Sequence, residues 1–249
     1  MEGLMPDFSG KVVLITGASR GLGRVLALGI ARRGGALAGT ARQLESSPGV
    51  GGTLAETRDL ARQAGARFLA IAGDITTYAG AQAAVDATLA EYGRLDVLVN
   101  NAGIFPKATI AQTSPADWRA LMDINVNAVF YATRAALPHL IAGGGGAILN
   151  VSSGAASGMA EGRVGYAVTK WGMNRLTVNL AAEVRQQNVA VNAINPGIIE
   201  TDMNLGRPGA DPPSVFEDSA VWLAAQRVPY TGRIVSRADF GKTWGAGVE

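Results

Sequence analysis

Cysteine is absent from this chain of 249 residues, and histidine occurs once, at His139. Without thiols the protein can form no disulfide, no cysteine nucleophile and no cysteine-ligated metal site, and it suits a reducing compartment such as the cytoplasm. We expect His139 to be an ordinary surface residue near a helix end, and we predict no metal site.

Charge and long apolar runs are also scarce. Only 17% of the residues are charged, the net charge is +2, and lysine and arginine are scattered singly. This pattern indicates neither a nucleic-acid-binding face nor a long disordered tail. No apolar run approaches the ~20 residues that span a bilayer, and the first residues lack the basic and apolar regions of a signal peptide. We therefore expect a cytoplasmic protein with no nucleic-acid or membrane partner.

Hydrophobic residues make up 48% of the sequence, which is ample for one large core. No repeat, linker or break in composition divides the chain, so residues 1–249 are predicted to form one domain. Seven short apolar strands are predicted, at Lys11–Thr16, Ala36–Ala41, Arg67–Ala72, Leu95–Val99, Ala147–Val151, Val189–Ile194 and Arg233–Val235. Helical patterns lie between them. This alternation predicts an α/β fold with a Rossmann-type doubly wound parallel sheet of about seven strands, flanked by helices on both faces.

The predicted helices carry recognisable start and stop signals. Six helices are predicted. The first three run from the glycine-rich turn to Arg33, from Thr53 to Ala64, and from the end of the third strand to about Tyr92. The last three run from the cap Ser114 to just before Gly143, through Tyr166 to about Gln187, and from Ser214 to Gln226. Gly93 is a stop signal, and Pro115 suits the first position of a helix.

The first strand is followed by G-A-S-R-G-L-G, with Gly17, Gly21 and Gly23 at the fixed positions. Three spaced glycines are a weak signal in a chain with 33 glycines. Their place between a strand and a helix strengthens it. In such a turn, backbone N–H groups and the helix N-terminus can face a pyrophosphate.

The second strand ends in T-A-R, where a fold that prefers NAD usually places an acidic residue for the ribose 2′-OH. Here Ala41 is followed by Arg42, and Arg20 lies within the glycine turn. Two guanidinium groups and no carboxylate favour an adenosine 2′-phosphate. We therefore expect NADP(H) rather than NAD(H). The alternative is that Arg42 is a solvated loop residue.

Two later strands also end in polar or small residues. Asp74 follows the third strand and could accept a hydrogen bond from an adenine amine, or it could cap the next helix. N-N-A-G at Asn100–Gly103 follows the fourth strand, and its small residues let the backbone approach a ligand closely.

Tyr166 and Lys170 are four residues apart, so on a helix they share one face. An ammonium beside the phenol would favour the phenolate and lower its pKa from ~10, which suits general acid–base catalysis. Ser153 lies upstream and could donate to a substrate oxygen. The alternative is a surface pair with the lysine stem along the ring. Asn125, within an apolar helix, is either a structural hydrogen-bonding residue or part of a proton relay.

The segment after Pro196-Gly197 is rich in glycine and proline and follows a parallel strand. Such a segment is where a substrate lid is found, and we predict one at about residues 200–220. Its part Met203–Pro213 mixes apolar and polar residues without a charged cluster, so a strongly anionic small acid is not the expected substrate.

T-G-A-S-R-G-L-G, N-N-A-G, Asn125, Ser153, Y-A-V-T-K and N-P-G-I-I-E-T occur in this order. With these motifs the chain resembles the short-chain dehydrogenase/reductase family over about Lys11–Met203. It looks like the branch that includes 3-oxoacyl-carrier-protein reductases. The long loop after Arg42 departs from many relatives. So does the ending T-G-R-I-V-S-R-A-D-F-G-K-T-W-G, where V-D-G-G is frequent.

The resemblance implies a role for each catalytic position. Tyr166 would protonate the carbonyl oxygen as hydride arrives, and Lys170 would lower the pKa of Tyr166 and hold the nicotinamide ribose. Ser153, rather than its neighbour Ser152, would fix the substrate oxygen. Asn125 would anchor a water leading to Lys170.

The resemblance also implies the cofactor contacts. The pyrophosphate turn would comprise Gly17, Ser19, Arg20, Gly21, Leu22 and Gly23, with Arg42 at the 2′-phosphate. Asp74 and Ile75 would hold the adenine, Asn101, Ala102 and Gly103 the adenosine side, and Pro196, Gly197, Ile199 and Thr201 the nicotinamide amide.

The implied activity is that of an NADP(H)-dependent carbonyl reductase or alcohol dehydrogenase, a ketoreductase acting on a small carbonyl or alcohol. A homo-oligomer, tetramer or dimer, is expected through the helices of Asn125 and Tyr166. Two alternatives remain: a catalytically idle NADP(H)-binding sensor or scaffold on the same fold, and an epimerase or dehydratase with a tightly held cofactor.

Overall fold

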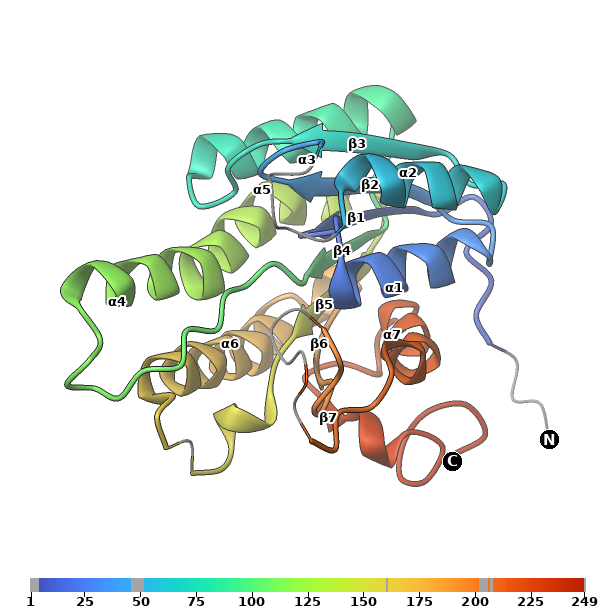
Figure 1. The fold of residues 1–249 in the computed structure, drawn as a ribbon. Helices are drawn as coiled ribbons and strands as arrows, with labels where there is room; N and C mark the ends of the chain where they lie inside the picture. The colour runs from blue at the N-terminus through green and yellow to red at the C-terminus, as the bar shows by residue number, and fades with distance from the viewer. Residues whose placement is uncertain (1–4, 46–51, 160, 202–205, 207, 249) are drawn as a thin grey trace.

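The computed structural model describes residues 5–45, 52–159, 161–201, 206 and 208–248. The strands form one sheet in which every neighbouring pair is parallel, in the order β3-β2-β1-β4-β5-β6-β7 (Figure 1). They are β1 Val12–Thr16, β2 Ala36–Ala41, β3 Phe68–Ala72, β4 Val97–Asn100, β5 Gly146–Val151, β6 Val189–Asn195 and β7 Ile234–Ser236. The predicted parallel sheet of seven strands is confirmed.

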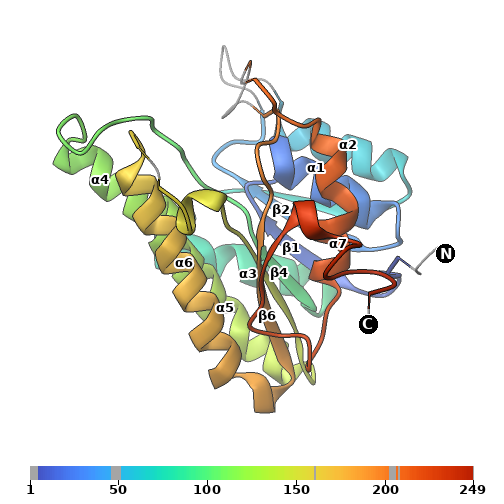
Figure 2. The ribbon, with the colours of Figure 1, turned by 90° about the horizontal axis from the view of Figure 1, so that it is seen from below.

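Helices cover both faces of the sheet (Figure 2). On one face lie α1 Gly21–Ala31, α2 Leu54–Gln63 and α7 Glu217–Ala224, and on the other α3 Tyr78–Tyr92, α5 Ala128–Ala142 and α6 Val164–Glu183. A short helix, α4 Pro115–Met122, precedes α5. Each face has its own buried apolar cluster, so the doubly wound arrangement is confirmed.

The central strands are apolar throughout because both of their faces are covered. Every residue of β1 (V-V-L-I-T) and of β4 (V-L-V-N) is buried. Continuous burial without alternation is typical of a parallel sheet between two helical layers.

The strand order reverses between β1 and β4, which are neighbours in the sheet. The connection after β1 leads to one side of the sheet and the connection after β4 to the other, so their loops diverge and leave a crevice. Ligands of open α/β sheets bind in this crevice, outside the carboxyl ends of the strands.

The helix predicted from Ser114 onwards is less regular than expected. Ser114 caps α4 as predicted, but a π-helical turn, Asp123–Asn127, separates α4 from α5. A π turn adds one residue to the helical ladder and is often found at functional sites. Asn125 lies within this turn and is fully buried.

Other helix bounds also differ from the prediction. α6 ends at Glu183 rather than near Gln187, because the chain continues as a short 3-10 turn. The last predicted helix begins as a 3-10 turn, Pro213–Phe216, and only then becomes α7. None of the helices in the described part of the chain combines the length and apolarity needed to cross a membrane.

Candidate active site

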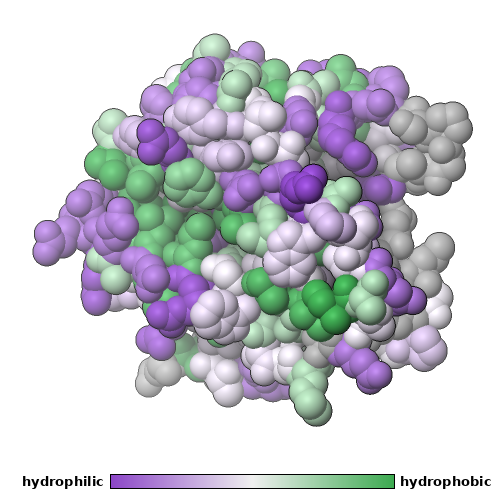
Figure 3. Space-filling view, turned by 90° about the vertical axis from the view of Figure 1, so that its left-hand side faces the viewer, coloured by the Kyte–Doolittle hydropathy of each residue, from purple (hydrophilic) through white to green (hydrophobic). Residues whose placement is uncertain are grey.

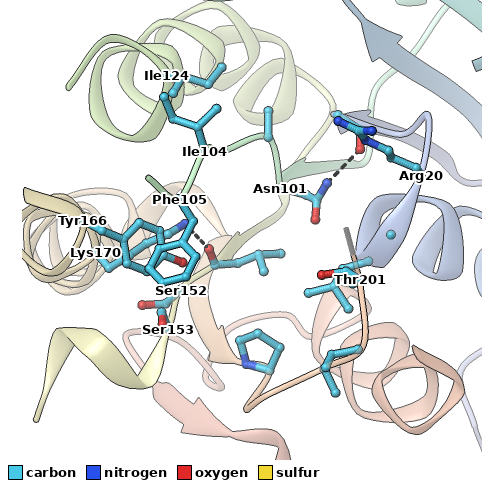
Figure 4. Close-up of a pocket in the computed structure, with 18 of the residues that line it drawn as sticks. Arg20, Asn101, Ile104, Phe105, Ile124, Ser152, Ser153, Tyr166, Lys170 and Thr201 are labelled. Atoms are coloured by element: carbon cyan, nitrogen blue, oxygen red, sulfur yellow. Dashed lines mark hydrogen bonds between the residues drawn. The ribbon is translucent and has the colours of Figure 1, made fainter. Parts of the chain in front are cut away.

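A cavity of about 770 Å³ lies at the carboxyl ends of the strands. Its walls include most of the residues predicted from the sequence: Gly17, Ser19, Arg20, Gly21, Leu22, Arg42, Asp74, Ile75, Asn101, Ala102, Gly103, Ser153, Tyr166, Lys170, Pro196, Gly197, Ile199 and Thr201. Two predicted residues, Gly23 and Asn125, do not line it. Figure 4 shows Ser153, Tyr166 and Lys170 at one end and Arg20 at the other.

The glycine turn is closed by close backbone packing. Gly17 and Gly21 have φ values of 69° and 54°, which favour glycine. A Cβ at Gly17 would lie 2.9 Å from the Ala102 Cα atom. The Asn101 amide nitrogen donates to the carbonyl oxygens of Thr16 (3.1 Å) and Gly17 (2.9 Å). The N-N-A-G segment therefore supports the turn.

Gly23 lies behind the turn instead of lining the cavity. A Cβ there would lie 2.2 Å from the Gly17 carbonyl oxygen and 2.5 Å from the Asn101 amide nitrogen. No side chain fits in this space. The third glycine of the motif thus lets α1 pack directly against the turn.

The N-terminus of α1 is open toward a ligand. Helices α2, α3 and α4 are each capped by a side chain, from Thr53, Thr77 and Ser114. The Arg20 side chain makes no such capping bond to α1, and the first turn of α1 contains no acidic residue. Gly21 and Leu22, in the first turn of α1, line the cavity, where an anionic group could accept from the N–H groups that the first turn of a helix leaves unpaired.

Arg24, on α1, holds the turn from behind and was not singled out from the sequence. Its side chain donates to the Ser19 carbonyl oxygen (2.7 Å), the Thr57 hydroxyl (2.9 Å), the Thr53 carbonyl oxygen (3.1 Å) and the Glu56 carboxylate (2.9 Å). These bonds connect the turn to α2. Residues 19 and 57 are far apart in sequence, so no local pattern predicts the contact.

Residues at the carboxyl ends of β2 and β3, among them Arg42 and Asp74, form one wall of the cavity. Arg42 is exposed and lines the cavity directly after Ala41. The Asp74 carboxylate accepts from the Thr76 backbone N–H (2.9 Å) and hydroxyl (2.6 Å). These hydrogen bonds, and to a lesser degree the charge of Arg42, lower the pKa of Asp74. Thr77, not Asp74, caps α3, so the alternative role considered for Asp74 is wrong.

The two neighbouring serines after β5 have different surroundings. Ser152 is buried, and its hydroxyl donates to the Asn174 side-chain oxygen at 2.6 Å. Ser153 is only half-buried and lines the cavity, where its hydroxyl lowers the pKa of the Tyr166 phenol. Its own oxygen also accepts from the Ala155 N–H at 3.2 Å. The preference for Ser153 over Ser152 therefore agrees with the surroundings of the two hydroxyls.

The expected lowering of the Tyr166 pKa by Lys170 is wrong for this structure. Burial raises the pKa of the Tyr166 phenol, and the Ser153 hydrogen bond and the charge of Arg163 offset only part of that rise. The Lys170 ammonium lies 5.7 Å from the Tyr166 ring centroid. It donates instead to the Val151 carbonyl oxygen at 2.8 Å. The phenol is consequently protonated at neutral pH.

Lys170 is itself strongly affected by its surroundings. The side chain is buried, and this desolvation lowers the pKa of its amine to about 8. Near pH 8 a large share of the lysine is therefore neutral, whereas the unfolded chain binds the proton up to a pKa of ~10.4.

This difference predicts a pH-dependent stability. The folded-state pKa is the lower one, so the cost of charging Lys170 is fully present below pH 8 and is relieved as the pH rises toward 10.5. Relative to Lys170→Met, the wild type should gain about 2 kcal/mol in unfolding free energy between pH 7 and pH 9.5. Urea denaturation of both proteins at several pH values measures this gain. Parallel curves would contradict the lowered pKa.

Asn125 connects three elements around the π turn. Its amide nitrogen donates to the Ile104 carbonyl oxygen (3.0 Å) and the Thr169 hydroxyl (3.2 Å), and its oxygen accepts from the Ile104 N–H (2.9 Å). Both amide protons are thus used in holding Ile104 and α6. The predicted relay through a water stays a prediction, and these bonds fit the structural alternative.

The end of the cavity beyond Tyr166 is mainly apolar. The Phe105 ring meets the Tyr166 ring edge-on, with centroids 4.6 Å apart at 61°. Further apolar walls come from Ile104, Ile124, Met159 and Ile198, and charged side chains from Asp123 and Arg163. Figure 3, which faces the carboxyl ends of the strands, shows hydrophobic side chains gathered on this side. Residues 202–205 and 207 of the predicted lid lie outside the described residues.

Comparisons with known proteins agree with this geometry. The family model of the short chain dehydrogenases matches residues 11–208. The 3-oxoacyl-acyl-carrier-protein reductase of Escherichia coli is 31% identical over 197 residues, covering 79% of this chain and 77% of that protein. A solved short-chain type dehydrogenase/reductase from Mycobacterium marinum superposes with a TM-score of 0.82 at 27% identity, covering 92% and 94% of the two chains. An NADH-dependent reductase solved with NAD superposes with a TM-score of 0.80 at 27% identity, covering 92% and 95%.

Proposed function

The chain belongs to the short-chain dehydrogenase/reductase family of oxidoreductases, and on that basis we propose that it is an NADP(H)-dependent enzyme interconverting a ketone and a secondary alcohol. One observation carries the proposal. Ser153, which follows β5, and Tyr166 and Lys170, both on α6, line the same cavity as the open N-terminus of α1. Residues 1–249 would form one domain, because all strands of the described chain share one sheet.

The residues around the cavity fit a dinucleotide. Gly17 and Gly23 have no room for a side chain, Gly21 has a positive φ that favours glycine, and the N–H groups of the first turn of α1 would be donors for a pyrophosphate. When bound, the nicotinamide supplies the hydride that is exchanged with the carbonyl carbon of the substrate. Asp74, Ile75 and Asn101–Gly103 would bind the adenosine half, and Pro196, Gly197, Ile199 and Thr201 the nicotinamide half.

Tyr166 is proposed as the general acid in the direction of reduction. Its phenol is protonated at neutral pH because burial raises its pKa, so it can give its proton to the carbonyl oxygen as that oxygen becomes an alkoxide. Alcohol oxidation needs the phenolate, and its rate should therefore increase with pH.

Ser153 and Lys170 are proposed to support this proton transfer. The Ser153 hydroxyl, which lines the cavity with Tyr166, can donate to the same substrate oxygen and hold it beside the phenol. Lys170 is fixed on the Val151 carbonyl oxygen and would hold the nicotinamide ribose. Asn125 would contribute through the position of Ile104 and α6.

Arg42 and Arg20 support the choice of NADP(H). The residue at the end of β2 is Ala41, so no carboxylate is present there to bind a ribose 2′-OH or to repel a 2′-phosphate. Arg42 is exposed at the same edge of the cavity, and a guanidinium binds phosphate with two parallel hydrogen bonds. NAD(H) is the less favoured cofactor.

The apolar walls around Phe105 and Ile124 favour a substrate with an apolar body near its carbonyl carbon. Asp123 and Arg163 bring charges of opposite sign to this end, so their net contribution does not favour a strongly anionic small acid. A ketone or a 3-oxoacyl thioester fits these walls.

A homo-oligomer is proposed through α5 and α6. Phe130 on α5 and Trp171 on α6 are 48% and 59% exposed, and Val164 and Val168 of α6 are also exposed. Large apolar side chains in such a position are typical of interfaces. Light scattering should therefore give a mass of two or four chains for the wild type and a lower mass for Trp171→Glu. A monomeric wild type would contradict the proposal.

The cytoplasm remains the predicted location.

The experiment that tests the function is NADPH oxidation at 340 nm with a panel of ketones and 3-oxoacyl thioesters, run in parallel with NADH. Turnover with a preference for NADPH is the expected result. Binding of NADPH without turnover of any carbonyl would favour the sensor or scaffold. Removal of a hydride from the substrate and its return to the same substrate, without net oxidation, would favour the epimerase.

A further inference from the structure

The C-terminal segment that departs from the family's frequent ending is fixed to the body of the protein by aromatic rings. The Trp244 indole N–H donates to the Ser236 carbonyl oxygen of β7 at 2.8 Å. The Trp244 ring packs on Phe240 and Trp222, with centroids 5.0 Å and 5.9 Å away. The segment around Arg237, which comes immediately after β7, is thus held by these contacts.

The Arg237 side chain reaches back to the loop that follows β6. Its Nε atom donates to the Pro196 carbonyl oxygen at 2.8 Å. The side chain is only 16% exposed. Gly197 has a φ of 78°, and a Cβ there would lie 3.3 Å from an Arg237 guanidinium nitrogen. Glycine at this position therefore leaves room for the guanidinium beside the backbone.

Arg237 also forms an ion pair with Asp211, at the far end of the segment that leaves β6. Asp211 is itself paired with the start of that segment. The Glu200 N–H donates to the Asp211 carbonyl oxygen (2.8 Å), and the Asp211 N–H donates to the Ile198 carbonyl oxygen (2.9 Å). These two bonds form an isolated parallel bridge between Ile199 and Asp211.

Arg237 therefore connects Pro196, where the chain leaves β6, with Asp211. Pro196, Gly197, Ile198 and Ile199 all line the cavity. None of the Arg237 contacts involves Ser153, Tyr166 or Lys170. Loosening this connection would move the cavity wall without touching the acid and its two polar neighbours.

We propose that Arg237 is a positioning residue, which holds residues 196–199, at the proposed nicotinamide and substrate end of the cavity, in place against Asp211. The role in catalysis rests on the proposed function above, whereas the mechanical connection does not. The two bonds to Arg237 are charge-assisted and well shielded on the arginine side, so each is stronger than an ordinary surface contact.

The test compares Arg237→Met with Arg233→Met. Arg233 is an exposed arginine just before β7 whose guanidinium lies over the Tyr230 ring, 5.8 Å from its centroid, and it has no bond to Pro196 or Asp211. For Arg237→Met we expect KM for NADPH and for the carbonyl substrate to rise about tenfold, with kcat within about threefold of the wild type. Arg233→Met should leave all three values unchanged.

Hydrogen exchange gives a readout that needs no substrate. The amide protons of Glu200 and Asp211 close the bridge and should exchange about tenfold faster in Arg237→Met, while those of the central strand β4 keep their wild-type rates. If the wild type turns over no carbonyl, the proposed function fails but the exchange rates still decide whether Arg237 holds the loop.

A second variant covers the case in which Arg237→Met fails to fold. Asp211→Asn removes the ion pair but keeps the backbone bridge and the Pro196 bond, and the Asp211 side chain is 47% exposed. Its KM and exchange rates should change in the same direction by a smaller factor. Unchanged exchange and unchanged KM in both variants would overturn the proposal, as would equal effects of Arg237→Met and Arg233→Met.

Discussion

Tyr166→Phe is expected to lower kcat by about 10³-fold or more, while the Kd for NADPH changes by less than about threefold. The substitution removes one oxygen atom and with it the phenol proton, which the raised pKa of Tyr166 retains at neutral pH. The ring remains, and with it the edge-on contact with Phe105. Binding should therefore persist while proton transfer to the carbonyl oxygen is lost.

Tyr131→Phe is the matched control for this prediction. Tyr131 is on α5, packs against Tyr78 and Phe130, and does not line the cavity. Tyr131→Phe also removes one hydroxyl group, and it should leave kcat unchanged. Isothermal titration with NADPH and initial rates at saturating substrate measure both quantities for both variants. A Tyr166→Phe enzyme that kept more than a tenth of the wild-type kcat would show that another group is the acid.

Arg42→Asp is expected to lower the ratio of kcat/KM for NADPH to that for NADH by about 100-fold. A charge-assisted hydrogen bond is worth about 1.5–3 kcal/mol, which corresponds to a factor of about 10 to 100, and the new carboxylate also repels a 2′-phosphate. With NADH the same carboxylate can accept from the ribose 2′-OH, so activity with NADH should rise or stay constant.

Arg62→Asp is the control for the change in charge. Arg62 is an exposed arginine in the last turn of α2 and lies outside the cavity. It undergoes the same change of two charge units, so any effect of the overall charge on cofactor attraction appears in both variants. Rates with both cofactors at 0.15 M salt measure the ratio. An equal ratio in the two variants would mean that Arg42 is a solvated loop residue and that NADP(H) specificity has another source.

Much of the site could be predicted because its signals are local. Gly17, Gly21 and Gly23 are recognisable from their place between a strand and a helix: Gly17 and Gly21 have positive φ values, and a Cβ at Gly23 would collide with the Gly17 carbonyl oxygen. Tyr166 and Lys170 share a helix face because of their spacing. Ser114 at the start of α4 is likewise a short-range signal, since the cap bonds a backbone group three residues away.

The contacts of Arg24, Asn125 and Arg237 could not be predicted in this way. Each side chain bonds partners that are separated from it by 20 or more residues, such as Asn125 with Ile104 and Arg237 with Pro196. The π turn at Asn125 also has no period of its own in the sequence. Within this turn the Asn125 amide bonds Ile104 and Thr169, which are 21 and 44 residues away.

The sequence by itself determined the order of strands and helices along the chain, the parallel sheet, the glycine turn and the Tyr166–Lys170 pair, because these follow from hydrophobic periodicity and short-range geometry, whereas the choice of Ser153 came from the resemblance to the family. The tertiary structure decided how those groups behave. Burial among side chains from other elements raises the pKa of Tyr166 and lowers that of Lys170 to about 8. The fold also pairs the Ser152 hydroxyl with the Asn174 side chain and the Arg237 guanidinium with the Pro196 carbonyl oxygen. Desolvation and charge depend on every neighbour within a few ångströms, and only the folded chain specifies which residues those neighbours are.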